Sequence, residues 1–174
     1  TTFEDATLRL DYTFMGNASE QYVALREMSY TDNWYGRRIN LDNVPLKGNG
    51  DLTLTDIATG ATIYKTSFSS LFQEWITTPE ALELSKSFEF TLLVPMPLNK
   101  CVATLVLRDN TGKESSHKFT IDPEDVLIRN LSKQKPLPYK YIHKGGDSKE
   151  AIDVVILAEG YTAEQMELFM EDAI

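Results

Sequence analysis

The sequence has almost no cysteine and no long apolar stretch, and each of these absences excludes a class of protein. A single cysteine, Cys101, excludes an internal disulfide framework. The longest unbroken apolar run spans residues 154–158, whereas a membrane-spanning helix needs about 20 apolar residues. Of the 174 residues, 42% are hydrophobic and 25% are charged, which is typical of a globular protein and excludes a disordered or fibrous one.

Positive charge is also scarce. The chain carries a net charge of −9 at pH 7. Residues 144–174 contain two lysines against eight acidic residues, a net of −6, and residues 1–143 contain 15 basic against 18 acidic residues, a net of −3. Nucleic-acid and anionic-membrane binding both draw on a surplus of basic residues. We therefore expect no nucleic-acid partner and no binding to anionic membrane surfaces. The short apolar runs described above also predict no membrane span.

The motifs of common catalytic sites are missing as well. A zinc site needs about three protein ligands and one open position, but the chain offers only His117, His143 and Cys101, without an H-E-x-x-H pair. We expect His117 to be at the surface or half-buried on a strand, His143 to be in solvent, and Cys101 to be a small buried thiol. No G-x-S-x-G, Walker A, G-x-G-x-x-G or calcium-loop pattern occurs. The sequence thus predicts no catalytic residue, metal ligand or cofactor in this chain.

Alternation of apolar and polar residues predicts strands in the first 120 or so residues. In residues 6–14 every even position is apolar and every odd position is polar, the period of a strand with one buried face. Gly60 and Gly112 each lie between two strand-like runs and predict hairpins. Pro95 and Pro97 are expected to end a strand, because proline cannot donate to a central ladder. The seven expected strands lie near residues 6–14, 22–30, 52–57, 62–68, 88–94, 101–107 and 115–121.

This pattern predicts a mainly β fold, an immunoglobulin-like antiparallel β-sandwich over residues 1–125, rather than a barrel. One short helix is expected at residues 78–81, where Thr78 could cap and Pro79 occupies the first helical position. The aromatic run at residues 68–75 is interpreted as a packed crossing between sheets or as a contact surface for a following domain.

A second aromatic cluster is the candidate binding surface. Trp34 and Tyr35 stand close to Arg37 and Arg38 in one loop. Exposed aromatic rings beside arginine can stack on sugars or form a protein-binding hot spot. The other interpretation, which the size of the rings favours, is that Trp34 and Tyr35 plug one end of the sandwich.

The remaining residues differ in character from the sandwich. Residues 126–150 are interpreted as a linker or arm, because prolines (Pro123, Pro136, Pro138), four lysines and the 145–148 Gly-Gly-Asp-Ser run surround or occupy them. Residues 152–158 are apolar apart from Asp153 and rich in β-branched residues, which predicts a strand buried on both faces.

A helix is expected after that strand. Thr162 stands three residues before Gln165, a capping-box spacing. The stripe that follows is Met166, Phe169, Met170, Ala173 and Ile174. No other α/β unit accompanies this strand and helix, and no Gly, Asn or Pro ends the helix. We therefore expect the front piece of a longer protein whose second domain starts at residues 151–174. In the alternative, strand and helix dock on the sandwich as an ornament.

Four short segments resemble the N-terminal part of the IgA-peptidase family of secreted zinc metallopeptidases. They are residues 34–36, 72–78, 95–97 and, most specifically, 153–162. The resemblance implies a β-sandwich followed by a catalytic domain in which zinc and a glutamate activate water. It also implies an extracellular or cell-surface location. No position here matches the family's zinc-binding motif, so zinc is implied only for the full-length protein.

The sequence thus favours a non-catalytic N-terminal sandwich that packs on, or positions substrate for, a downstream catalytic domain. The expected partners are that domain and a protein or glycan substrate. One alternative is a free-standing module that binds glycan or protein through the Trp34/Tyr35 loop. Another is a structural spacer in a surface protein.

Overall fold

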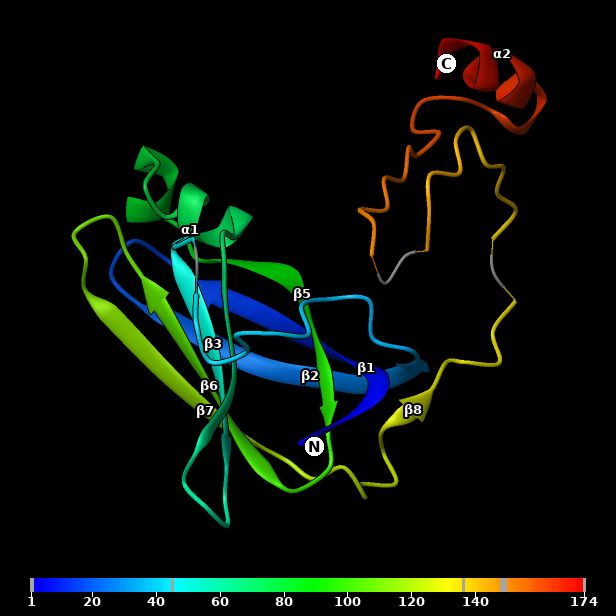
Figure 1. Cartoon of the computed structure of the whole chain (residues 1–174). Helices are drawn as coiled ribbons and strands as arrows, with labels where there is room; N and C mark the ends of the chain where they lie inside the picture. The colour runs from blue at the N-terminus through cyan, green and yellow to red at the C-terminus, as the bar shows by residue number, and fades with distance from the viewer. Residues whose placement is uncertain (1, 45, 136, 148–149, 174) are drawn as a thin grey trace. The chain divides into compact units, whose positions relative to one another are not determined.

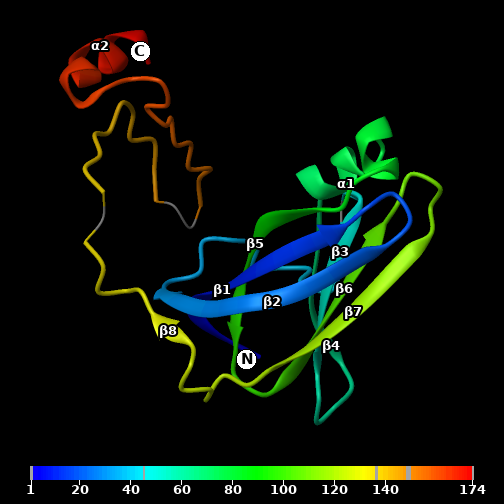
Figure 2. The same cartoon turned by 180° about the vertical axis from the view of Figure 1, so that it is seen from behind.

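The computed structural model describes residues 2–44, 46–135, 137–147 and 150–173. The chain divides into two compact units, residues 1–134 and residues 135–174 (Figure 1). The first unit is a β-sandwich, and the predicted antiparallel sandwich is therefore confirmed. Figure 2 views the same unit from behind, with β1 and β2 in front.

Two four-stranded sheets form the sandwich. All pairs are antiparallel except β2 with β8, which is parallel. The first sheet has the order β5 (Lys86–Pro97), β1 (Phe3–Gly16), β2 (Gln21–Asp32) and β8 (Arg129–Asn130). The second has the order β4 (Thr62–Phe68), β3 (Gly50–Asp56), β6 (Cys101–Arg108) and β7 (Glu114–Ile121).

Strand β1 lies between β2 and β5 and shows the predicted alternation. Leu8, Leu10, Tyr12 and Phe14 are fully buried in the core. The intervening side chains point to the outer face of the sheet, because successive residues of a strand face opposite sides. Each fully buried Leu or Phe side chain contributes about 1.5–3 kcal/mol of transfer free energy, so this one strand supplies much of the core.

An aromatic cluster joins the two sheets at one end. Phe14 of β1 stacks on Phe90 of β5 with ring centroids 4.9 Å apart, and Phe68 of β4 lies 4.9 Å from Phe90. Phe72 contacts Phe14 edge-on at 6.4 Å. Such pairs add about 0.5–1.5 kcal/mol each beyond their buried area.

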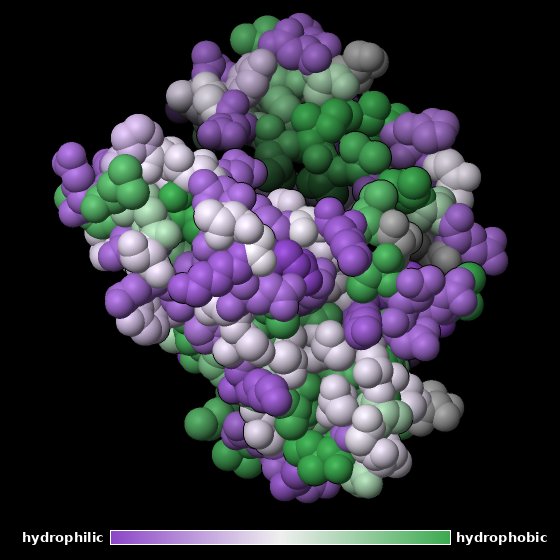
Figure 3. All heavy atoms as spheres, turned by 90° about the vertical axis from the view of Figure 1, so that its left-hand side faces the viewer, coloured by the Kyte–Doolittle hydropathy of each residue, from purple (hydrophilic) through white to green (hydrophobic). Residues whose placement is uncertain are grey.

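Outside the core, hydrophilic side chains extend across the middle of the face in Figure 3.

The crossing from β4 to β5 contains a helix that the sequence did not predict. It is α1 (Leu71–Trp75), with Ser70 as N-cap accepting a hydrogen bond from the Gln73 N–H at 3.2 Å. A single helical turn carries no 3.6-residue periodicity, which is why the pattern missed it. The crossing itself agrees with the expectation for residues 68–75. The predicted short helix forms the 3-10 helix η1 (Pro79–Leu82).

The expectation that Pro95 and Pro97 close their strand is wrong for Pro95 but holds for Pro97, the last residue of β5. Strand β5 continues through Pro95, which pairs with Thr7, to Pro97, which pairs with Phe3 of β1. Strand β5 is an edge strand that pairs only with β1, and an edge strand tolerates the missing N–H of proline. Strand β8 was also not predicted, since two residues show no alternation.

In the second unit the predicted strand at residues 152–158 is wrong. These residues form neither strand nor helix, and Ile152, Val154, Val155 and Leu157 are 77–92% exposed. An apolar β-branched run adopts a strand only where a neighbouring strand pairs with it, and no strand pairs with it among the described residues.

The predicted helix is present as η2 (Ala163–Gln165) and α2 (Met166–Asp172). The Thr162 backbone N–H donates to Gln165 Oε1 at 2.9 Å, as the capping spacing predicted. Tyr161 packs on Phe169 with ring centroids 5.3 Å apart. Ile174 of the expected stripe, and Pro136 and Ser148 of the expected linker, lie outside the described residues.

Replacing Phe14 with leucine tests the core. Phe14 is fully buried and contacts Phe68, Phe72 and Phe90. We expect Phe14→Leu to lower the free energy of unfolding by about 1–2 kcal/mol, measured by urea unfolding. Tyr22→Leu is the control, because Tyr22 is 53% exposed and should change stability by less than about 0.5 kcal/mol. Equal effects of the two variants would contradict this assignment of the core.

Candidate functional site

The loop after β2 holds the candidate binding residues, and it buries one of the two aromatic rings. Trp34 is 7% exposed, and its ring meets Tyr64 edge-on at 6.1 Å. The indole N–H donates to the Arg37 carbonyl at 2.9 Å. Tyr35, by contrast, is 59% exposed. Trp34 therefore plugs the sandwich, while Tyr35 faces solvent and does not.

Both arginines of the candidate surface fasten this loop. Arg37 donates to the carbonyl oxygens of Leu41, Asn43 and Lys65. Arg38 donates to the Trp34 carbonyl and, at 2.7 Å, to Asp5 Oδ1, which also accepts the Trp34 backbone N–H at 3.0 Å. The four predicted residues thus share one loop. Of these four, Tyr35 alone keeps a side chain that is mostly exposed and not engaged in holding the loop.

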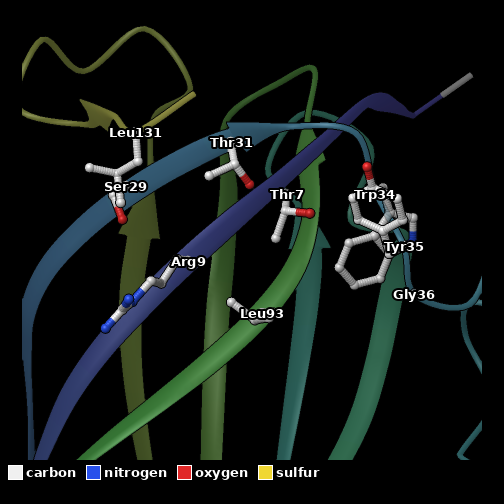
Figure 4. Close-up of a pocket in the computed structure, with 9 residues that line it drawn as sticks. All are labelled: Thr7, Arg9, Ser29, Thr31, Trp34, Tyr35, Gly36, Leu93 and Leu131. Carbon is white, nitrogen blue, oxygen red and sulfur yellow. The ribbon is translucent and has the colours of Figure 1, made fainter. Parts of the chain in front are cut away.

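Beside Tyr35, a groove of about 460 Å³ runs over the outer face of the first sheet (Figure 4). Its floor follows from strand register: Arg9 of β1 pairs with Ser29 of β2 on one side and with Leu93 of β5 on the other. Thr7 pairs with Thr31 in the same way. The lining residues are Thr7, Arg9, Ser29, Thr31, Trp34, Tyr35, Gly36, Leu93 and Leu131.

The sequence analysis missed Leu93 and Leu131 as part of this surface. Leu93 is 53% exposed at the groove. Leu131 follows β8, and its backbone N–H donates to the Tyr30 carbonyl at 2.9 Å. The available signal for Leu93 was its odd position in the predicted strand 88–94, whose even positions are all apolar, so that alternation places Leu93 on the outer face. Leu131 gave no such signal, because only the pairing of β8 with β2 brings it to the groove.

The groove carries no free charge among its lining residues. Arg9 is its charged member, and its guanidinium donates to both carboxylate oxygens of Asp11 at 2.9–3.0 Å. Burial raises the pKa of Asp11, but hydrogen bonds from Arg9 and Thr91 and the charges of Arg9 and Arg26 outweigh burial, so the pKa lies below its usual 3.8. The arrangement suits an apolar, uncharged partner surface.

Cys101 and the two histidines are the remaining candidates for chemistry, and each has a local environment of its own. Cys101 is fully buried, and burial together with the nearby charge of Asp56 raises its pKa to about 11. His117 is half-buried on β7, and its Nε2 lies 2.7 Å from Ser115 Oγ. Burial lowers the pKa of His117. His143 is exposed. These positions are the ones the sequence predicted.

The donor set does not fit zinc. Across residues 2–44, 46–135, 137–147 and 150–173, no three His, Cys, Asp or Glu side chains come together as an ion-binding group. No catalytic step through a metal is therefore derived for this chain. Within the same residues, no helix combines the length and apolar character that crossing a membrane takes.

Comparison with known proteins adds the family. A family model described as Peptidase M64 N-terminus matches residues 1–120. No curated protein matches the chain. The family match agrees with the resemblance to the N-terminal region of IgA-peptidase-family metallopeptidases. Residues 34–36, 72–78 and 95–97 lie within the matched range, and residues 153–162 lie beyond it.

The buried carboxylate beside the groove predicts a pH dependence. The lowered pKa of Asp11 means that its stabilising contribution is fully present above its unfolded pKa of about 4 and is lost as pH falls through the folded pKa. At pH 7 we expect Asp11→Asn to lower the free energy of unfolding by about 1–2 kcal/mol. The difference from the unmodified chain should shrink below pH 4, as measured by urea unfolding at several pH values.

Glu4→Gln is the matched control for this change, an exposed carboxyl on the same strand. It should alter stability by less than about 0.5 kcal/mol at every pH. A pH-independent difference between Asp11→Asn and the unmodified chain would show that the charge of Asp11 does not stabilise the fold.

Burial and the raised pKa of Cys101 predict an unreactive thiol, because the thiolate is the nucleophile. At pH 8 a disulfide-exchange reagent should fail to label the folded chain and should label one thiol in denaturant. Labelling of the folded chain at the rate of a free thiol would contradict the burial of Cys101.

Proposed function

The chain belongs to the Peptidase M64 N-terminus family, and on this premise we propose that its sandwich packs on, and positions substrate for, a zinc-dependent catalytic domain that follows it. The sandwich has a non-catalytic role in this proposal. The donor set of the residues that the structure describes, which does not fit zinc, is consistent with that role. Export to the cell surface or the extracellular space belongs to the same proposal and is supported by the family resemblance.

The groove on the first sheet is the docking surface in this proposal, and it is the observation that carries the proposal. Its rim holds Tyr35 and Leu93, which are 59% and 53% exposed, and its one charged lining residue is neutralised by Asp11. Leu131, which lines the groove, lies three residues before the end of the first compact unit at Gln134. The polypeptide that leads to a following domain therefore leaves the sandwich a few residues after a residue of this apolar surface.

Residues 152–158 supply a second argument. Five apolar side chains here are 52–92% exposed, a state that water disfavours by about 25 cal/mol for each Å² of apolar surface. A sheet of the catalytic domain would bury both faces of this run. We accordingly assign residues 1–125 to the accessory sandwich, residues 126–150 to a linker or arm, and residues 151–174 to the beginning of the catalytic domain.

Introduced cysteines test the docking surface. Leu93→Cys and Tyr22→Cys start from equal exposure, 53% each, and buried Cys101 does not compete for reagent. In the 174-residue chain a maleimide should label both at similar rates. In the polypeptide that includes the catalytic domain, we expect labelling of Leu93→Cys to slow by about tenfold or more, since docked surfaces must open before reagent enters.

Tyr22→Cys serves as the control, because Tyr22 lies near the opposite end of β1, paired with Met15. Its labelling rate should not change. If Leu93→Cys labels equally fast with and without the catalytic domain, the groove is not the docking surface.

A peptidase assay tests the non-catalytic role. The 174-residue chain, supplied with zinc and a protein substrate, should show no hydrolysis above background. Zinc-dependent proteolysis that a chelator abolishes would overturn the proposal.

The exposure of Tyr35 beside the groove favours one second candidate, glycan or protein binding by the sandwich itself. Tyr35→Ala is a sharper test than Trp34→Ala, because Trp34 is buried and its loss would disturb the loop. Selective loss of a measured glycan affinity in Tyr35→Ala, with unchanged unfolding, would favour this candidate. Absence of glycan binding by the unmodified chain would exclude its glycan form.

A further inference from the structure

Residues 137–147 lie at the start of the second compact unit and have an unusual composition. Between Leu131 and Gly146 the chain has four lysines and no acidic residue, although the whole chain has a net charge of −9. Two of these lysines, Lys140 and Lys144, fall within residues 137–147. The described residues here form no helix and no strand.

The side chains of this segment are open to solvent. Leu137, Tyr139 and Tyr141 are 63–85% exposed. Its ring contacts are between residues near in sequence: Tyr139 meets Tyr141 edge-on at 5.5 Å, and Lys144 Nζ lies 5.4 Å from the centre of the Tyr141 ring. Among the described residues, no backbone–backbone hydrogen bond joins residues 137–146 to another part of the chain.

The chain before this segment is held differently. The Ser132 hydroxyl accepts the Asp32 N–H at 2.9 Å, and the Gln134 N–H donates to the Leu131 carbonyl at 3.0 Å. The anchored part of the sandwich therefore extends to about residue 134. A protease binds its substrate as an extended strand, which favours unfolded, exposed segments over hydrogen-bonded ones.

We propose that residues 137–147 form a processing site, at which a trypsin-like protease separates the sandwich from the residues that follow. Such a protease binds lysine or arginine through an acidic specificity pocket. Water adds across the Lys140–Tyr141 or Lys144–Gly145 peptide bond, leaving a carboxyl group on the lysine and an amino group on the next residue. Lys135 is excluded because proline follows it and removes the backbone N–H.

This inference is independent of the docking proposal, since it concerns the connecting segment and not the groove. The sandwich loses no core residue on cleavage, because every buried hydrophobic residue of its core lies between Ala6 and Ile121. Cleavage should therefore release a folded product with residues 1–140 or 1–144.

Limited digestion of the 174-residue chain with trypsin, followed by mass spectrometry, tests the site. We expect the first cuts after Lys140 and Lys144, faster by at least about a hundredfold than cuts within the strands of the sandwich, which require its unfolding. The released sandwich should unfold at the same temperature as the uncut chain.

The double variant Lys140→Gln/Lys144→Gln should lose these early cuts, and the matched control Lys65→Gln/Lys118→Gln, on strands β4 and β7, should keep them. First cuts within residues 2–134, or a product that no longer folds, would overturn the proposal. Survival of the unmodified chain uncut on the same timescale would overturn it as well.

Discussion

The strict alternation along β1 is the constraint on which the rest of the sandwich depends. Its even-numbered residues from Leu8 to Phe14 are fully buried, and a shift of one residue in register would move all of them to solvent. Because β1 pairs with both β2 and β5, the same constraint fixes the outer face. The odd-numbered residues of β1 point to this outer face, and two of them, Thr7 and Arg9, line the groove.

One side of each sheet gains extra backbone hydrogen bonds from a short neighbouring segment. Strand β8 pairs with β2, and the Leu41 carbonyl accepts the Lys65 N–H of β4 at 2.7 Å, next to the Arg37 contacts. Unpaired strand edges promote edge-to-edge association. The loop that carries Trp34 thus closes one end of the core and also protects an edge, which explains why its two arginines bond to backbone carbonyls of the chain itself.

The two units differ in how far local sequence decides their structure. In the sandwich, each apolar strand finds partners within the chain. In the second unit, the capping contact of Thr162 with Gln165 forms locally and the helix follows, whereas the apolar run at residues 152–158 lacks a paired strand and stays irregular. Helices satisfy their own hydrogen bonds, but a strand needs a neighbour. The capping signal was therefore sound for the helix, whereas the apolar run was wrong for the strand.

By itself, the sequence determined the sandwich, its seven long strands, the buried Cys101 and the start of α2, because period-two patterning and capping are local properties. Only the tertiary structure decided that Arg37 and Arg38 hold the loop by hydrogen bonds and that Trp34 is buried whereas Tyr35 is exposed. It also decided that Leu93 and Leu131 line the same groove. Those outcomes depend on strand register and on contacts between residues far apart in the chain, such as Arg38 with Asp5. A one-dimensional pattern does not contain such distances.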